Sequence, residues 1–272
     1  MKVLPGVPEV AVFDTSFHQT WDPVHYLYSL PYKYYEKYGA RKYGAHGTSV
    51  RYVSQKAAEI MKRDLKDLKL IVCHLGSGAS VTAVKDGKSF DTSMGFSPMA
   101  GITMSSRSGD VDPSLLAFVM KKENLDADQM LKVLNNESGL LGISGISPDM
   151  RDLRGDMTKL EGQKKKRADL ARNIFINRII RYIGAYTLEM RGLDGIAFTA
   201  GVGEHDFGVR EHVMDSLELL GLKPDSAANK ENATIITKPD STIVGMVIPT
   251  NEELMIERDV VRVAAVSYTH LR

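Results

Sequence analysis

One turn between two apolar runs combines glycines with a hydroxyl in a way that could bind an anion. Residues 71–74 form an apolar run that is typical of a buried strand, and the chain becomes apolar again soon after it. Between the two runs, Gly76 and Gly78 bracket Ser77. Glycine lets backbone N–H groups approach a ligand with no Cβ in the way, and successive exposed N–H groups form a concave anion site. The turn is therefore a candidate phosphate-binding loop.

A second pair of glycines, Gly201 and Gly203, follows the apolar run 195–200 and precedes a helical pattern. Two strand-ending glycine turns can together hold the phosphates and the sugar of a nucleotide. For either turn alone, a tight corner with no ligand is the more common explanation. The chain contains no G-x-x-x-x-G-K-[ST] loop, no H-E-x-x-H and no paired C-x-x-C, so no familiar motif decides between the two explanations.

Four polar residues that could act on a phosphate lie next to apolar strands or in glycine-rich loops. Asp14 ends "VAVFD" and His74 ends "LIVCH", whereas His46 lies in "YGAHGTS" and Arg107 in "MSSRSGDVDP". Each alone is more often a structural polar residue with satisfied hydrogen bonds. Together they indicate phosphoryl transfer, in which catalysis is mostly positioning and cationic stabilisation of spread negative charge. The seven histidines are scattered without the spacing of zinc ligands.

The elements that must position these residues alternate between strands and helices, which predicts the α/β class. Strands are expected at 10–14, in three runs within 69–91, at 195–200 and at 242–250. The third of those runs follows Asp86-Gly87, a strong hairpin signal. Helices are expected at 47–65, 113–122, 126–135, 165–191, 209–221 and 252–266. Thr48 or Ser49 is the expected cap of the first helix, and 137–145 is expected to be a glycine-rich connection.

The bulk composition excludes several function classes. The chain has 272 residues, a net charge of +1 and 43% hydrophobic residues, which fits a globular protein and gives no sign of nucleic-acid or membrane binding. The basic run 163–167 fits a solvated helix face better than an anion patch. Cys73 is the single cysteine, it lies in an apolar run, and it fits a small buried group better than a nucleophile. A reducing, cytoplasmic location is the expectation.

Longer motifs bring a family resemblance. The chain closely resembles the acetate kinase (acetokinase) family of the acetate and sugar kinase/Hsc70/actin superfamily. The matching runs are "PGVPEVAVFDTSFHQT", "LPYKYYEKYGARKYGAHGTS", "HLGSGAS", "DTSMGFSPMAGITMSSRSGDVDP", "ESGLLGISGISPDMRDLR", "FTAGVGE" and "IPTNEELMI". The resemblance implies an actin-like ATPase (ribonuclease H-like) fold with a mixed sheet and flanking helices.

The resemblance also implies an activity, which is the reversible ATP-dependent phosphorylation of acetate to acetyl phosphate by direct in-line transfer. It implies ATP/ADP and Mg²⁺ as cofactors, acetate as the second small-molecule ligand, and a cytoplasmic homodimer formed through the second domain. Two alternatives stay open. One is a truncated, catalytically incompetent nucleotide-binding remnant, and the other is a propionate- or butyrate-type carboxylate kinase.

Site residues carry over from the family motif by motif. The catalytic set that the resemblance implies is Asp14, His46 and Arg107. The implied nucleotide contacts are His74, Leu75, Gly76, Ser77 and Gly78 in the first turn, Asp149, Met150 and Arg151 near the adenosine, and Gly201, Val202, Gly203, Glu204 and His205 in the second turn. Pro98 and Ala45 are implied for the acetate pocket, and Glu252 for the Mg²⁺ site.

The chain also departs from the family pattern. The family's first domain begins with a phosphate-side loop and carries a substrate-binding arginine, and neither is found here, so we expect an N-terminally truncated chain. The expected division is a remnant of the first domain at 1–18, a nearly complete nucleotide-binding second domain at 19–253, and a closing helix with an atypical tail at 254–272. Ser77 stands where the family usually has Asn, and His205 replaces another Asn. Ala45 stands where the family has Phe, which would leave room for a larger acyl group.

Overall fold

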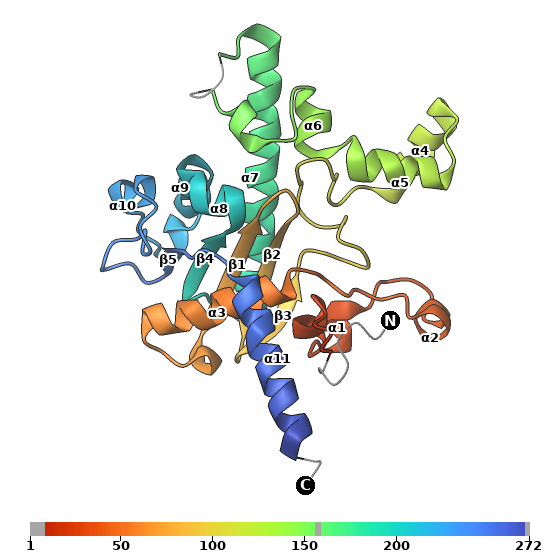
Figure 1. Cartoon of the computed structure of the whole chain (residues 1–272). Coiled ribbons are helices and arrows are strands. Elements are labelled where there is room, and N and C mark those ends of the chain that lie inside the picture. Colours follow the sequence, from red (N-terminus) through yellow and green to blue (C-terminus); the bar gives the residue numbers. More distant parts are fainter. Residues whose placement is uncertain (1–8, 156–158, 270–272) are drawn as a thin grey trace.

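A five-stranded mixed sheet forms the centre of the molecule (Figure 1), in a computed structural model that describes residues 9–155 and 159–269. The strand order is β3-β2-β1-β4-β5. Strands β1, β2 and β3 pair antiparallel, whereas β4 and β5 extend the sheet parallel to β1. The bounds are Lys69–Leu75 (β1), Ala79–Lys85 (β2), Lys88–Thr92 (β3), Gly195–Thr199 (β4) and Val244–Val247 (β5).

Helices cover both faces of this sheet because alternate residues of its central strands are apolar on both sides. Ile71 and Cys73 face the core that includes α7 (Gly162–Met190), whereas Leu70 and Val72 face α3 (Gly47–Met61). Strands buried on both faces are near-continuous apolar runs, which is how 70–73 reads. Figure 1 shows α7 behind the sheet and α3 in front of it, with α11 (Glu252–Thr269) beside α3.

The two hairpin turns of the sheet confirm the prediction for 69–91. Asp86 and Gly87 join β2 to β3 with φ values of 54° and 74°, as a two-residue type I′ turn requires. The turn between β1 and β2 is closed by a hydrogen bond of 3.1 Å from the Gly76 N–H to the Gly78 carbonyl. Both turns are therefore specified by residues that are adjacent in the sequence.

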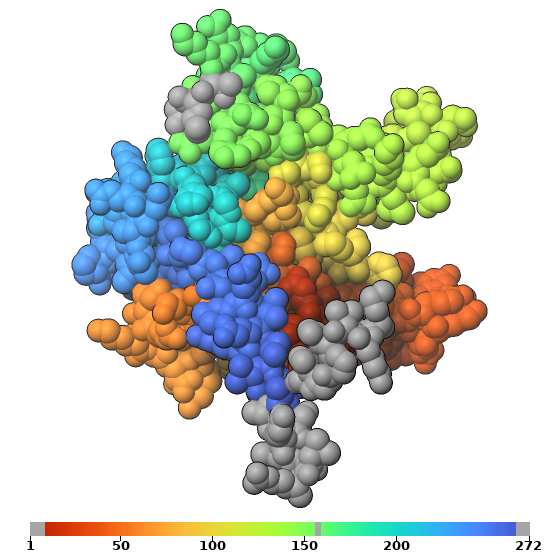
Figure 2. Space-filling model, in the orientation of Figure 1, coloured from red at the N-terminus to blue at the C-terminus, as the bar shows by residue number. Residues whose placement is uncertain are grey.

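Most of the predicted helices are also confirmed, with small changes at their ends, but the helix expected at 209–221 ends at Asp215 and is followed by a 3₁₀ turn at Glu218–Leu220. Asp112 and Asp126 cap α4 (Pro113–Glu123) and α5 (Ala127–Asn136), and Arg191 in the left-handed region ends α7. The other helices are short: α1 (Pro23–Tyr26), α2 (Lys33–Tyr38), α6 (Gly139–Ser144), α8 (Ala200–His205), α9 (Phe207–Asp215) and α10 (Ser226–Lys230). Figure 2 shows the segment around α2 and the α4–α5 segment as two lobes that project from the body on one side.

Three local predictions were wrong. Residues 10–14 are not a strand, because no described strand pairs with them and the Asp14 carbonyl instead accepts from the Gly47 N–H. Part of 137–145 is helical, as α6. The second glycine turn is not a loop: 200–205 fold as α8 directly after β4, because neither Gly201 nor Gly203 takes a positive φ that would break the helix.

Two predictions about exposure are confirmed. The basic run 163–167 is exposed along the first turns of α7, and Cys73 is fully buried in β1. Among the described helices, none combines the length and apolar character that a membrane crossing requires.

Candidate nucleotide and phosphoryl-transfer site

A cavity of about 370 Å³ lies between residues 10–13 and α11, but a larger one of about 620 Å³ opens at the carboxyl end of β1. A volume of several hundred Å³ is typical of a cofactor or nucleotide site, and in open α/β sheets ligands bind beyond the carboxyl ends of the strands. Its lining comes from the β1–β2 turn, the 148–154 segment, α7 and α8, and comprises Gly76, Ser77, Ser105, Leu140, Pro148, Asp149, Met150, Arg151, Arg154, Phe175, Gly201, Val202, His205 and Asp206.

The β1–β2 turn, whose Gly76 and Ser77 line this cavity, also brings two distant side chains close to its third residue, Gly78. A Cβ placed on Gly78 would lie 3.3 Å from Arg107 Nη1 and 3.5 Å from His46 Nε2. Only a residue without a side chain therefore leaves the space between the guanidinium, the imidazole and the turn open. The Ser77 carbonyl accepts a hydrogen bond from the Ser105 N–H (3.3 Å), which ties the turn to the loop that carries Arg107.

Asp14 holds His46 in place through the backbone. The Asp14 carboxylate accepts from the His46 N–H at 2.5 Å and from the Thr48 N–H at 3.2 Å, and its carbonyl accepts from the Gly47 N–H at 2.9 Å. His46 is the N-terminal cap residue of α3 and has a φ of 61°. The cap expected from Thr48 or Ser49 is thus wrong, because a carboxylate from a distant segment satisfies the free N–H groups of the helix.

His46 and His74 form a stacked pair above the turn. Their ring centroids lie 4.0 Å apart at an interplanar angle of 21°. Burial, together with a smaller effect of the Arg107 charge, lowers the pKa of His46 to about 4. Burial lowers the pKa of His74 to about 3, with a smaller contribution from His46. Both rings are therefore neutral near pH 7, because two cations next to Arg107 in a desolvated site are unfavourable.

Hydroxyl groups hold the other nitrogens of this pair. His46 Nδ1 lies 2.9 Å from Ser80 Oγ, and His74 Nδ1 lies 2.8 Å from Ser49 Oγ. Ser49 Oγ in turn lies 2.8 Å from Thr250 Oγ1. Sequence reasoning missed these three hydroxyls. The signal for Ser80 was present, because it pairs with His74 across β1 and β2 and so shares its face.

Arg107 approaches the turn from the loop after β3. Its Nη1 donates to the Pro98 carbonyl at 3.0 Å and contacts Met104 Sδ at 3.8 Å. Pro98 thus meets Arg107 through its backbone. Ala45 packs against the core, and its carbonyl accepts a hydrogen bond of 2.9 Å from His18 Nε2.

The structure places some predicted nucleotide residues outside the cavity lining. Leu75 is fully buried in the core, and Gly203 packs α8 against β1, where a Cβ would lie 3.4 Å from the Cys73 carbonyl. The Glu204 carboxylate accepts from the Ala200 N–H at 2.8 Å and so closes its own helix. Asp149 and Arg151 line the cavity and pair with each other at 2.6 Å. Phe175 of α7 was missed, because an apolar residue in a helix carries no sequence signal of a site.

Glu252 begins α11 on the side of the site where Asp14 lies. Burial raises the pKa of the Glu252 carboxyl, and the negative charge of Asp14 raises it further. The Glu252 carboxyl therefore lies within electrostatic range of the Asp14 charge.

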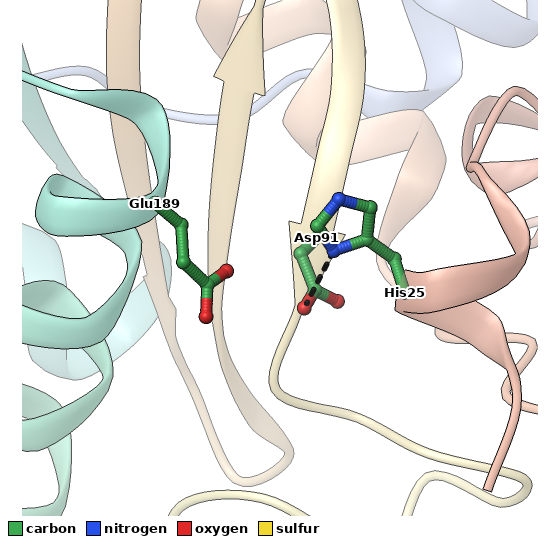
Figure 3. Close-up of side chains that lie close together, drawn as sticks. All are labelled: His25, Asp91 and Glu189. Carbon is green, nitrogen blue, oxygen red and sulfur yellow. Dashed lines mark ion pairs between the residues drawn. The ribbon is translucent and has the colours of Figure 1, made fainter.

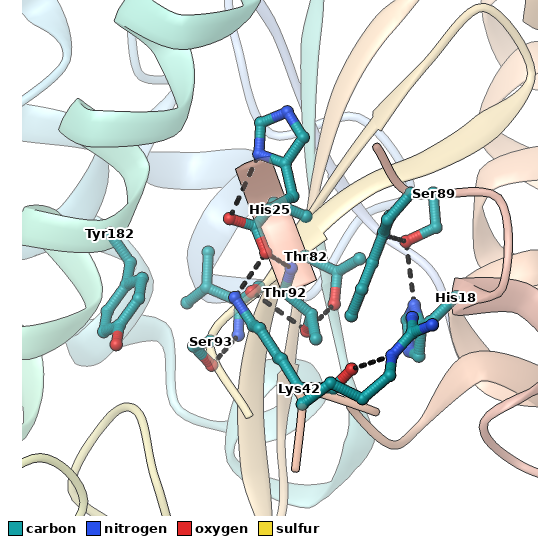
Figure 4. Close-up of polar contacts among 12 residues, drawn as sticks. His18, His25, Lys42, Thr82, Ser89, Thr92, Ser93 and Tyr182 are labelled. Atoms are coloured by element: carbon teal, nitrogen blue, oxygen red, sulfur yellow. Dashed lines mark hydrogen bonds and ion pairs between the residues drawn. The ribbon is translucent and has the colours of Figure 1, made fainter. Parts of the chain in front are cut away.

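A second polar cluster joins the segment before α3 to the sheet edge. His25, Asp91 and Glu189 offer ligand atoms within 4.8 Å of one another (Figure 3), the one such metal-like group among the described residues. The Lys42 ammonium already hydrogen-bonds to Asp91, and His25 Nδ1 lies 3.8 Å from the same carboxylate. Because the Lys42 ammonium compensates the negative charge of Asp91, the cluster serves as a structural link between residues 25–42 and β3. Figure 4 shows this link and, beside it, the hydrogen bond between His18 and Ser89, whose length is 2.8 Å.

The mixed sheet, the helices on both faces and the cavity at the glycine turn define an α/β domain of the actin-like ATPase type. A crystal structure of Porphyromonas gingivalis acetate kinase matches with a TM-score of 0.92 and 43% identity, over 97% of this chain and 66% of that one. A propionate kinase from Francisella tularensis matches with a TM-score of 0.85 and 42% identity, over 93% and 64%.

Sequence comparison agrees with the structural one. An acetate kinase from Lacticaseibacillus paracasei is 57% identical over 95% of this chain and 65% of its own length, and one from Geobacillus sp. is 54% identical over 97% and 66%. The profile of the Acetokinase family matches residues 1–258. The chain belongs to the acetokinase family, and it spans slightly less than two thirds of the length of these curated relatives.

Proposed function

We propose that the protein catalyses the reversible ATP-dependent phosphorylation of acetate to acetyl phosphate. The observation that carries the proposal is the position of Gly78 against both Arg107 and His46, in the turn whose Gly76 and Ser77 line the 620 Å³ cavity. The cavity has room for a nucleotide, and the turn offers backbone N–H groups to its phosphates. The names of the acetate kinase relatives supply the acceptor.

The site chemistry fits an in-line transfer. Acetate is already ionised near neutral pH, so no strong base is needed to activate it. The protein must instead neutralise the oxygens of the transferring phosphoryl group. Arg107 supplies a fixed positive charge, and His46 supplies a neutral hydrogen-bond donor, because burial and the charge of Arg107 keep the pKa of His46 at about 4.

Mg²⁺ fits the carboxylate pair of Asp14 and Glu252. Carboxylate oxygens are the ligands that this cation prefers, and the charge of Asp14 helps to raise the pKa of Glu252. We infer that these two residues would hold the metal. When bound, Mg²⁺ would supply positive charge to the phosphate oxygens. The His46 and Thr48 N–H groups keep the Asp14 carboxylate in its position.

The test is direct. The purified chain is incubated with ATP, Mg²⁺ and acetate in the presence of hydroxylamine, and acetyl hydroxamate is measured by colour. Formation of hydroxamate that requires both ATP and acetate supports the proposal. Measurable ATP binding without hydroxamate refutes it for this chain and favours a nucleotide-binding role alone.

A second candidate acceptor is propionate. The specific observation is Ala45, whose small side chain stands where we expected Phe from the family pattern, and a matching structure is named as a propionate kinase. A single methylene changes binding by only about 1–3 kcal/mol in an apolar pocket, so kcat/KM for acetate, propionate and butyrate decides the preference.

We further infer a cytoplasmic homodimer assembled through the second domain. The two projecting lobes in Figure 2 carry exposed apolar side chains, among them Leu30 and Tyr32 on one lobe and Leu115 and Phe118 on the other. Exposed apolar groups of this kind mark association surfaces. Sedimentation of the purified chain over a range of concentrations tests the dimer. The division at 1–18, 19–253 and 254–272 stays a prediction.

A further inference from the structure

The orientation of His46 depends on a single buried hydroxyl. Ser80 lies in β2 with no solvent exposure, and its Oγ is 2.9 Å from His46 Nδ1. Among the described residues, the His46 ring is the one hydrogen-bond partner of this hydroxyl. The other ring nitrogen, Nε2, points to the space between Gly78 and Arg107. The bond to Ser80 therefore decides which nitrogen faces the turn as a donor.

The direction of the hydrogen bond between Ser80 and His46 follows from the number of hydrogens that the two groups carry. A serine hydroxyl carries one hydrogen, and leaving a buried donor without an acceptor is unfavourable. If the His46 Nδ1 carried the proton, Ser80 would accept and its own hydrogen would have no acceptor among the described residues. If Ser80 donates to Nδ1, both groups are satisfied. The neutral ring then carries its hydrogen on Nε2.

A second Ser–His pair in the same sheet shows the same arrangement with an independent constraint. His18 Nε2 lies 2.9 Å from the Ala45 carbonyl, which can only accept, so His18 must be protonated there. Its Nδ1 then accepts from Ser89 Oγ at 2.8 Å, while Ser89 accepts from Trp21 Nε1 at 2.9 Å. At His18, where the Ala45 carbonyl fixes the tautomer, a buried strand serine thus donates to Nδ1 of an Nε2–H ring.

We propose that Ser80 is a positioning residue that holds His46 as the Nε2–H tautomer and so presents an N–H group to the phosphoryl oxygens between Gly78 and Arg107. The tautomer follows from the contacts of Ser80 alone, whereas the target of the N–H rests on the proposed function. The His74 ring, stacked at 4.0 Å and held by Ser49, keeps the His46 plane from turning. The His46 ring is therefore held by the Ser80 hydroxyl at its edge and by the His74 ring against its face.

The experiment reads the tautomer directly. The full chain is labelled with ¹⁵N-histidine, and two-bond ¹H–¹⁵N spectra are recorded near pH 7, with the His46 signals assigned from a His46→Gln spectrum. We expect the wild-type His46 to show the Nε2–H pattern. Ser80→Ala should show a mixture of the two tautomers. Ser89→Ala, which removes a matched Ser–His bond at His18, should leave the His46 pattern unchanged.

Kinetics form the second readout. Ser80→Ala should lower kcat for acetyl hydroxamate formation by about tenfold or more, because a wrong tautomer cannot donate, with KM for ATP unchanged. Ser80→Thr keeps the hydroxyl and should restore most of kcat. A merely structural role for Ser80 would lower stability in Ser80→Ala and Ser89→Ala alike and would leave the tautomer fixed.

Each outcome decides the proposal. A wild-type His46 protonated on Nδ1, or a Ser80→Ala chain with an unchanged tautomer or an unchanged kcat, overturns it. The expected tautomer pattern in a wild-type chain that forms no hydroxamate supports the role of Ser80 and refutes the proposed acetate kinase activity instead. The two failures are therefore distinguishable.

Discussion

Acidification should destabilise the fold through His18, a buried histidine outside the proposed catalytic set. Burial lowers the pKa of His18 to about 4, against a small opposing effect of its bond to the Ala45 carbonyl. The side chain is 1% exposed, so solvent screening is weak. The perturbation is a change of pH from 7 to 5, across which the folded chain keeps this ring neutral.

The sign and size follow from proton linkage. Because the folded pKa lies below the unfolded value of about 6.5, the unfolded chain binds the proton first as the pH falls. The stabilisation is present in full above the unfolded value and is lost between there and the folded value of about 4. For one site with these two values, the free energy of unfolding decreases by about 2 kcal/mol between pH 7 and pH 5.

The assay is urea unfolding of the wild type and His18→Gln at both pH values. Gln can still donate to the Ala45 carbonyl but cannot be protonated in this range. His46 and His74 contribute further pH dependence, because burial lowers the pKa of both, but they are common to the two chains. The loss of stability from pH 7 to pH 5 should therefore be about 2 kcal/mol smaller in the variant than in the wild type.

An equal loss in both chains would refute the reasoning, because it would mean that His18 takes up its proton equally in the folded and the unfolded state. The absolute stability of His18→Gln does not enter the comparison. Only the difference between its two pH values is used, so a lower stability of the variant at pH 7 leaves the test intact.

Three further predictions concern the site and its strand. Arg107→Ala should lower kcat by about 10²–10³-fold and change the Kd for ATP far less, because the Arg107 charge acts on the transferring phosphoryl group. If isothermal titration showed ATP affinity falling by the same factor as kcat, this role would be contradicted. Gly78→Ala should lower kcat about tenfold while shifting the free energy of unfolding by less than about 1 kcal/mol. The reason is that the new Cβ would lie 3.3 Å from Arg107 and 3.5 Å from His46 but away from backbone atoms. A loss of stability with a normal kcat would contradict this prediction. Cys73 should not react with Ellman's reagent in the folded chain, because it is fully buried and burial raises the pKa of its thiol; rapid labelling would show that β1 opens.

Local chain chemistry predicted the parts of the fold that depend on neighbours in sequence. The Asp86-Gly87 hairpin and the long helix α7 lie within a few residues of their predicted positions. The strand expected at 10–14 did not form, because a strand needs a partner that no local pattern can specify. The segment 200–205 was expected to be a glycine loop, yet its glycines are compatible with a helix when β4 directs the chain into one.

The site divides in the same way between residues that a motif marks and residues that only packing brings in. Gly78, His46 and Arg107 lie in separate motifs, and their meeting depends on the fold. Ser80 could have been found by strand alternation from His74, since the two residues pair across the hairpin. Phe175 could not, because its place in the cavity depends on how α7 packs against the sheet.

The electrostatics of the site explain why the Arg107 cation lies beside the neutral His46 ring and not beside a second cation. A second permanent charge next to Arg107 would be repelled by it in a desolvated space. Burial and this repulsion both lower the pKa of His46. A neutral imidazole costs less to bury and still donates a hydrogen bond, provided that its hydrogen is on the nitrogen that faces the ligand. That condition is what the hydroxyl of Ser80 supplies, so the serine in β2 and the arginine in the following loop have complementary effects on one ring.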